Sequence, residues 1–185
     1  MGTREDFAAL AEAHAGGIYA YFRRLGVEAT AAEDLAQETF LTAWENLGAL
    51  RDQRRIRSWL YGIAYRRYLK HRESAACHAT VPISEELAER GGDPANERSL
   101  SAQAVRAVVQ GLPDEYRQAL VLVYWEDLSY KEAARALALP LGTFAWRVHK
   151  ALKLARKALA EEQGSDESER DEQATGGRPD PVREG

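Results

Sequence analysis

Residues 128–159, LSYKEAARALALPLGTFAWRVHKALKLARKAL, contain two short helical patterns separated by a tight break. Ser129 followed by Glu132 is a capping box, in which the hydroxyl and the carboxylate each cap a backbone N–H at the start of a helix. Small residues on the inner face of this first helix would let a second helix cross it closely. This arrangement predicts a helix-turn-helix.

The break between the two helical patterns lies at residues 138–141, ALPL. Pro140 lacks an N–H and disfavours helical geometry at Leu139, so we expect the first helix to end there. Gly142 and Thr143 follow, and we predict that Thr143 caps the second helix.

The second helix has a basic outer side, and no acidic residue lies between Thr143 and Ala160. Its outward positions are Ala145, Trp146, His149, Lys150 and Lys153, with Arg147 nearby. A helix-turn-helix with positive charge on one side is suited to phosphate neutralisation and insertion into the major groove of DNA. The alternative is an ordinary solvated basic face.

Length and composition indicate a small globular protein of 185 residues, 45% hydrophobic and 29% charged, with a net charge of −4. One cysteine, Cys77, excludes an internal disulfide framework and a thiolate zinc site. No apolar run reaches membrane-spanning length and the amino terminus lacks a leader pattern. We therefore expect a cytoplasmic protein without a membrane partner, a metal or another cofactor.

The amino-terminal part of the chain predicts two helices. The first spans Asp6 to Leu25, and Gly26 occupies the position of a left-handed cap. The second opens with an apparent capping box at Thr30 and Glu33 and runs to about Leu47. Acidic residues cover its outer side, which is either solvated or a surface for a partner.

A third helix, predicted over Ile56 to Glu73, combines aromatic and basic residues. Tyrosine rings stack on unpaired bases while arginines follow the backbone of a single strand. We assign Trp59 to the core. The alternative for the tyrosines is that they cover this core and do not bind nucleic acid. The candidate single-strand surface comprises Tyr61 and Tyr65 with Arg54, Arg55, Arg57 and Arg66.

The rest of the chain predicts an all-α fold of two small helical domains joined by a flexible linker, the second domain containing the helix-turn-helix. Residues 112–125 should form its central helix, because residues 119–123 are apolar on every side. The tail is polar and acidic, so we expect it to be disordered. The predicted boundaries are 1–75, 76–97 for the linker, 98–162, and 163–185 for the tail.

From about Phe7 to Ala160 the chain resembles the extracytoplasmic-function group of bacterial RNA polymerase sigma factors. Residues 33–44, EDLAQETFLTAW, resemble the polymerase-binding helix of that group, and residues 57–67, RSWLYGIAYRR, its promoter-melting helix. Residues 111–137 and 139–152 resemble its second conserved domain. These motifs occur in the family's order along the chain.

The resemblance implies partners for both surfaces. The residues expected to dock on the clamp helices of the polymerase large subunit are Asp34, Gln37, Glu38, Leu41 and Trp44. The apolar second domain would bind the flap tip. The Tyr61 and Tyr65 helix would capture the melted minus-ten strand. The minus-thirty-five duplex would be read by Thr143, Ala145, Trp146, Arg147, His149 and Lys150. Many relatives also bind an anti-sigma factor.

The chain departs from the family pattern at three sites, which comprise five residues. Tyr65-Arg66 replaces the usual Arg-Asn, and Ala145-Trp146 replaces Lys/Arg-Ser, so contacts with DNA are expected to differ. Ala138 replaces the usual turn glycine, which should strain the turn.

The leading hypothesis is a promoter-specificity subunit that recognises minus-ten and minus-thirty-five elements. One alternative is a sigma-like interaction protein that binds polymerase or an anti-sigma factor without selecting promoters. Another is a helix-turn-helix repressor. An enzyme is least supported, because no residues have the spacing of a nucleophile with its base or of a metal site.

Overall fold

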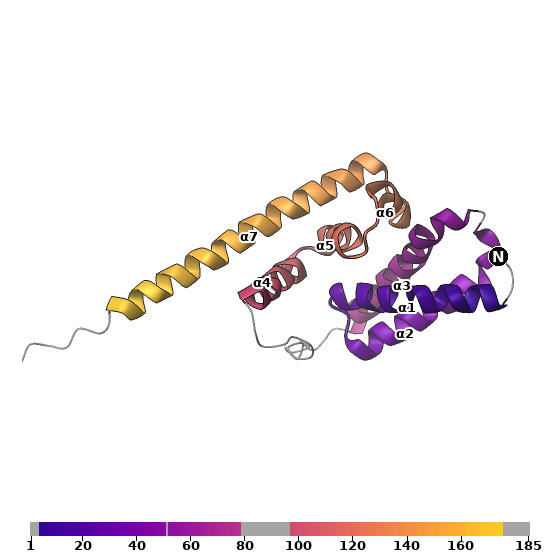
Figure 1. Ribbon diagram of the computed structural model, residues 1–185, viewed down its shortest axis with the longest axis horizontal. Helices are drawn as coiled ribbons and strands as arrows, with labels where there is room; N and C mark the ends of the chain where they lie inside the picture. The colour runs from indigo at the N-terminus through magenta and orange to yellow at the C-terminus, as the bar shows by residue number, and fades with distance from the viewer. Residues whose placement is uncertain (1–3, 51, 79–96, 176–185) are drawn as a thin grey trace, which may run out of the picture.

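The computed structural model describes residues 4–50, 52–78 and 97–175, and all regular structure in them is helical. Figure 1 shows two groups of helices side by side, which confirms the predicted all-α fold. The helices are α1 (Arg4–Arg24), α2 (Ala29–Glu45), α3 (Ile56–His78), α4 (Glu97–Gly111), α5 (Asp114–Leu120), α6 (Tyr130–Ala136) and α7 (Leu141–Thr175). Single turns form η1 (Leu47–Ala49), η2 (Gln53–Arg55) and the π-helical η3 (Val121–Trp125).

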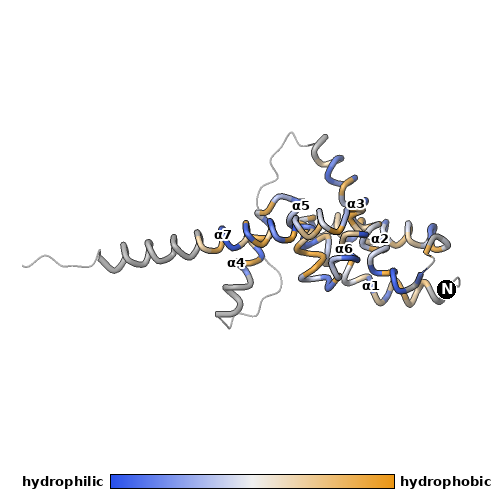
Figure 2. Tube along the Cα trace, turned by 90° about the horizontal axis from the view of Figure 1, so that it is seen from above, coloured by the Kyte–Doolittle hydropathy of each residue, from blue (hydrophilic) through white to orange (hydrophobic). Residues whose placement is uncertain are grey.

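Helices α1, α2 and α3 form the first domain, in which α2 contacts both of the others. Along these helices hydrophobic and hydrophilic residues alternate (Figure 2), so each helix can bury one side. The fully buried side chains include Ile18, Tyr21, Phe22, Leu60 and Tyr68. Gly26 has a φ of 86° and ends α1 in the left-handed conformation that the sequence predicted.

The start of α2 differs from the prediction. The carboxylate of Glu28 accepts the backbone N–H groups of Thr30 at 2.9 Å and Ala31 at 3.2 Å, and these bonds lower the pKa of Glu28. The helix therefore begins at Ala29, and the capping box predicted at Thr30 and Glu33 is wrong. A glutamate side chain is long enough to reach the free amides of the first turn, so it replaces the shorter cap.

Helices α4 to α7 form the second domain. The α5–η3 segment is buried at residues 119–122, which confirms its predicted central position. The helix does not continue regularly, because the N–H of Glu126 bonds to the carbonyl of Val121 at 3.0 Å, five residues back. That π-helical turn displaces the following loop and directs Glu126 into the interior, where only 5% of the residue is exposed.

The helix-turn-helix consists of α6, a short turn and the beginning of α7. The capping box of Ser129 and Glu132 is present, as predicted. Ala138 has a φ of 53°, so the position expected to be strained does adopt the left-handed conformation. The prediction that Thr143 caps the second helix is wrong: α7 begins at Leu141, and the N–H of Phe144 bonds to the carbonyl of Pro140 at 3.0 Å.

Helix α7 continues to Thr175, into the segment for which the sequence predicted disorder. A polar segment cannot form a packed core of its own. It can still extend an existing helix, because each added residue forms one hydrogen bond and no new helix has to be nucleated. Residues 176–185 lie outside the described residues, as does most of the predicted linker, residues 79–96. None of the described helices combines the length and apolarity needed to cross a bilayer.

Candidate polymerase and nucleic-acid interfaces

An apolar groove of about 460 Å³ lies between α1 and α2. We call it the docking groove; it is lined by Phe7, Ala11, Ala15, Ala36, Gln37, Phe40, Leu41 and Trp44. Leu41 is 63% exposed and Trp44 42% exposed, although the Trp44 ring contacts Phe7 edge to face at 5.0 Å. Large exposed apolar side chains on one helix are typical of a surface that binds another protein.

Acidic residues lie beside this groove on α2. Asp34, Gln37 and Glu38 are exposed, as predicted for the polymerase-binding set. Glu38 also pairs with Arg67 of α3 at 3.1 Å, and Arg67 donates a second bond to the hydroxyl of Thr42. The structure thus brings the predicted residues together, with Glu38 also joining α2 to α3.

The connector before α3 is ordered by Asp52. Its carboxylate accepts the backbone N–H of Arg54 at 3.1 Å, and these hydrogen bonds from Arg54 are the main cause of its lowered pKa. Arg54 and Arg55 also form ion pairs with Asp52, at 3.2 and 3.3 Å. A hollow of about 330 Å³ beside the connector is lined by Leu50, Asp52, Arg55, Ser58, Trp59, Gly62, Arg66 and Arg135.

The predicted single-strand residues of α3 lie in different environments. Arg66 is exposed and Tyr65 is half-buried. Tyr61 is only 5% exposed, and its hydroxyl donates to the carboxylate of Glu126 in the second domain. Burial is the main cause of the raised pKa of Tyr61, and the hydrogen bond to Glu126 is the second. The guanidinium of Arg57 donates to the backbone carbonyl of Glu126. In this arrangement of the domains Tyr61 is buried, and the half-buried Arg57 is bonded to the second domain.

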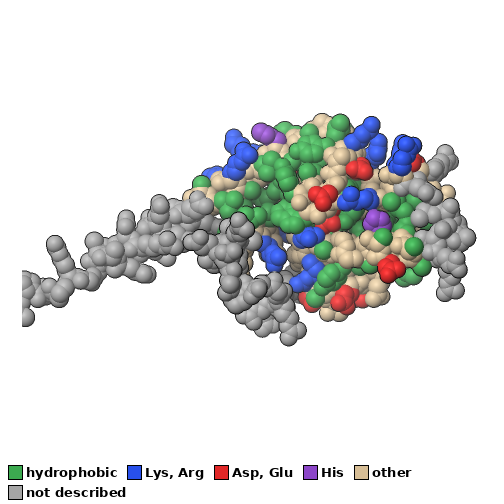
Figure 3. Space-filling model, viewed as in Figure 1, with side chains coloured by type: hydrophobic (Ala, Val, Ile, Leu, Met, Phe, Trp, Pro, Cys, Tyr) green, Lys and Arg blue, Asp and Glu red, His purple; other side chains and the backbone are tan. Residues whose placement is uncertain are grey.

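Along the amino-terminal part of α7, the predicted duplex-reading residues are mostly exposed. Lys150 and Lys153 are exposed and form no ion pair with another described residue. Thr143 and His149 are also exposed and Ala145 is half-buried. Figure 3 shows Lys and Arg side chains with a histidine along the upper edge of the molecule, over α7.

Two of the predicted duplex-reading residues also contact their own domain. Arg147 pairs with Glu115 of α5 at 3.3 Å. Trp146 is 55% exposed, and its ring meets Tyr116 of α5 at 6.1 Å in an edge-to-face arrangement. Trp146 and Arg147 therefore both attach the amino-terminal part of α7 to α5.

Sequence reasoning missed Glu126. Burial raises its pKa, although Tyr61, Arg24 and Arg57 act in the opposite direction. Its carboxylate lies 2.5 Å from the guanidinium of Arg24 in the first domain. No local pattern marks a buried acid between Trp125 and Asp127, because its partners are far away in the sequence. Among the described residues no cluster of His, Cys, Asp and Glu has the geometry of a metal site.

Comparisons with known proteins agree with both domains. Residues 10–76 match the family model for sigma-70 region 2, and residues 102–159 match that for sigma-70 region 4. The RNA polymerase sigma-H factor of Pseudomonas aeruginosa is 31% identical over 172 residues, which cover 85% of this chain and 88% of that protein. The ECF RNA polymerase sigma factor SigW of Bacillus subtilis is 28% identical over 172 residues, covering 85% and 91%. This chain belongs to the extracytoplasmic-function group of RNA polymerase sigma factors.

Solved structures of sigma factors share the fold. The sigma factor RpoE of Bartonella quintana, solved with the anti-sigma factor NepR, has a TM-score of 0.70 at 22% identity and covers 84% of this chain and 98% of that one. CnrH, solved with the cytosolic domain of CnrY, has a TM-score of 0.61 at 22% identity and covers 89% and 92%. The family-model matches assign the first domain of this sigma factor to region 2 and the second to region 4.

Proposed function

We propose that this sigma factor binds core RNA polymerase and directs promoter-specific initiation through minus-ten and minus-thirty-five elements. The observation that carries the proposal is the presence of both sigma regions in one chain, aligned over most of a sigma factor's length. An ordinary helix-turn-helix repressor would account for the second domain alone.

The docking groove supports the polymerase-binding step. Leu41 and Trp44 offer a large apolar contact on a rigid helix, and the neighbouring acids Asp34 and Glu38 set the charge that a partner must complement. The clamp helices of the polymerase large subunit are the partner that the family resemblance implies for this surface. We propose the apolar second domain as the seat of the flap tip.

The amino-terminal part of α7 supports duplex recognition. Exposed His149, Lys150 and Lys153 can neutralise phosphates, which supplies affinity, while Trp146 offers a ring to thymine methyl groups or sugars. Promoter selection requires no covalent chemistry from this chain, so we assign it no enzymatic activity, and we propose that it acts in the cytoplasm.

Run-off transcription on a library of genomic fragments tests the proposal. Purified core polymerase is assayed with and without the full chain, and new start sites are sequenced. We expect discrete starts that share two upstream elements.

If the chain binds core polymerase but produces no new starts, the proposal is overturned. The sigma-like interaction protein would then be the better description, with Tyr65-Arg66 and Ala145-Trp146 as the substitutions that remove promoter selection. An anti-sigma factor is a proposed partner under both descriptions.

A further inference from the structure

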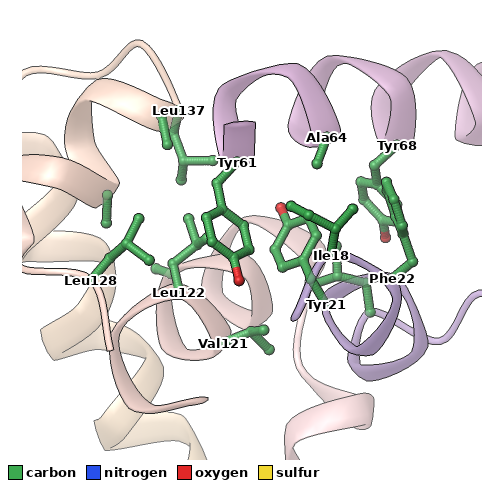
Figure 4. Packing of buried hydrophobic residues seen from close by; sticks show 14 of the residues in the cluster. Ile18, Tyr21, Phe22, Tyr61, Ala64, Tyr68, Val121, Leu122, Leu128 and Leu137 are labelled. Carbon is green, nitrogen blue, oxygen red and sulfur yellow. The ribbon is translucent and has the colours of Figure 1, made fainter. Parts of the chain in front are cut away.

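The hollow of about 330 Å³ beside the connector lies along one side of α3. Ser58, Gly62 and Arg66 line it and are spaced four residues apart, so they share one side of the helix. Figure 4 shows that other residues of α3, among them Tyr61 and Ala64, point into the buried core. The hollow is therefore a feature of a different side of α3 from the core.

Gly62 marks the place where both domains border this hollow. A Cβ atom at this position would lie 3.3 Å from the carbonyl oxygen of Ala136 in α6 and 3.7 Å from Nη1 of Arg66. The guanidinium of Arg66 thus reaches the place where α3 crosses α6. Arg135, the residue before Ala136, lines the hollow from the second domain.

Positive charge predominates in the lining of the hollow. Arg55, Arg66 and Arg135 line it, and Asp52 is the one acid among the lining residues. The Asp52 carboxylate is already engaged, because it accepts the N–H of Arg54 at 3.1 Å and pairs with both Arg54 and Arg55. Arg66 and Arg135 form no ion pair with another described residue. Two cations of the lining are thus left for a ligand.

A phosphate group matches these two cations. The planar fork of a guanidinium binds two phosphate oxygens at once, and these charge-assisted hydrogen bonds are stronger than neutral ones. Because Arg66 and Arg135 come from different helices, they can approach one phosphate group from two sides. Both residues are exposed, so a dissolved ligand can reach them.

The hollow also has an apolar wall. Leu50 and Trp59 line it, and both are half-buried. An aromatic ring of this kind can stack on a planar base whatever the identity of that base. A volume of about 330 Å³ is at the small end of ligand sites, so it suits a single small molecule.

We propose that this hollow binds a small phosphate-bearing molecule, held by Arg66 of the first domain and Arg135 of the second. The chemistry that the site recognises is a free group of one or more phosphates; a nucleoside phosphate would also place its base against Trp59. Arg55 and Arg66 belong to the candidate single-strand surface as well, whereas Arg135 does not, so the two sites differ in composition. The site goes beyond the proposed function, because it needs neither polymerase nor promoter.

Isothermal titration calorimetry on the full chain tests the site with pyrophosphate, ADP and adenosine. Pyrophosphate supplies the phosphates alone, ADP adds a base to the same two phosphates, and adenosine lacks phosphate. We expect at least one of the two phosphate probes to bind with a Kd of about 1 mM or below, the range of ordinary small-ligand affinities. Tighter binding of ADP assigns the site to nucleotides, and equal affinities assign it to inorganic phosphates; both outcomes support it. The proposal is overturned if neither phosphate probe binds, or if adenosine binds as tightly as ADP.

Matched substitutions locate the bound ligand. Arg135→Gln removes the charge contributed by α6. Its control is Lys131→Gln, because Lys131 is exposed about one turn earlier on the same helix and does not line the hollow. Arg66→Gln and Lys70→Gln form the corresponding pair on α3. Loss of a charge-assisted hydrogen bond should weaken binding about tenfold in Arg135→Gln and in Arg66→Gln, and each control should bind like the parent.

The four substituted positions are exposed, so the Tm without ligand should stay close to that of the parent. A weakening confined to Arg66→Gln would place the ligand on the single-strand surface alone and overturn the composite site. Equal weakening in Arg135→Gln and Lys131→Gln would indicate a general attraction by net charge and also overturn it. The titration contains neither polymerase nor DNA, so failure of the proposed function is recognised separately, by run-off transcription without new starts.

Discussion

Ala138 provides a direct test of the helix-turn-helix geometry. Its φ of 53° is left-handed, and its N–H bonds to the carbonyl of Arg135 at 3.1 Å to close the turn. An L-residue in this conformation costs about 1–2 kcal/mol, and glycine avoids that cost. Glycine also increases the conformational entropy of the unfolded chain, and this effect offsets about 0.4–1 kcal/mol of the stability gained in the turn.

Ala138→Gly should therefore stabilise the chain by about 0.5–1 kcal/mol. A chain of this size shifts its Tm by about 2–4 °C for each kcal/mol, so we expect an increase of about 1–4 °C. The measurement is thermal unfolding followed by circular dichroism at 222 nm, a wavelength that reports helix.

Ala13→Gly is the matched control, because Ala13 is exposed within α1 and has ordinary helical geometry. There the same change should destabilise by about 1 kcal/mol. If Ala138→Gly lowers the Tm as much as Ala13→Gly does, the left-handed turn is not occupied and the reasoning is refuted.

Three other predictions concern charge, docking and pH. Lys150→Ala should reduce the slope of log affinity for promoter duplex against log salt concentration by about one. Arg147→Ala should reduce that slope by clearly less, because the guanidinium of Arg147 is already paired. The slopes are measured by fluorescence anisotropy in a salt titration, and equal reductions for the two variants would contradict the prediction. Leu41→Ala should weaken core-polymerase binding by about 1 kcal/mol or more without lowering the Tm, because the side chain is exposed; a binding titration and a melt separate the two effects. Hydrogen bonds from Ser129 lower the pKa of Glu132. The capping contribution of Glu132 to stability is therefore fully present above the ordinary glutamate pKa, and it is lost as the pH falls through the lowered pKa of the folded state. Glu132→Gln should accordingly cost about 0.5 kcal/mol near neutral pH and less near about pH 3, measured as urea midpoints; a difference that grows in acid would refute the assignment.

Local signals in the sequence predicted the helices of both domains. Ser129 and Glu132 are three residues apart, and Gly26 follows an amphipathic run, so neighbouring residues alone decide these features. Predictions at the helix starts were less accurate. Helix α2 begins earlier than predicted because the long side chain of Glu28 caps its first turn. Helix α7 also begins earlier than predicted, because the fixed φ of Pro140 suits the start of a helix.

The candidate site was predicted only in part, because its contacts are not local. Glu126 and Arg24 are 102 residues apart in sequence, and no periodic pattern connects them. Tyr61 among arginines was interpreted as a surface for unpaired bases, and the same composition also suits an interface between domains. The role of Tyr61 in strand binding remains a prediction, since in this arrangement it is buried.

The contact between the domains combines close backbone packing, buried apolar side chains and an ion pair. At the crossing of α3 and α6 the backbones pack closely, because a Cβ atom on Gly62 would lie 3.3 Å from the carbonyl oxygen of Ala136. Arg24, on the polar side, is already partly open to solvent, so separation returns its charge to water at modest cost. Tyr61 contributes a large buried ring to the same contact, packed edge to face against Tyr21 at 5.4 Å. Separating the domains would expose the Tyr61 ring and remove Arg24 and Tyr61 from the Glu126 carboxylate, so apolar burial and paired polar groups both stabilise the observed arrangement.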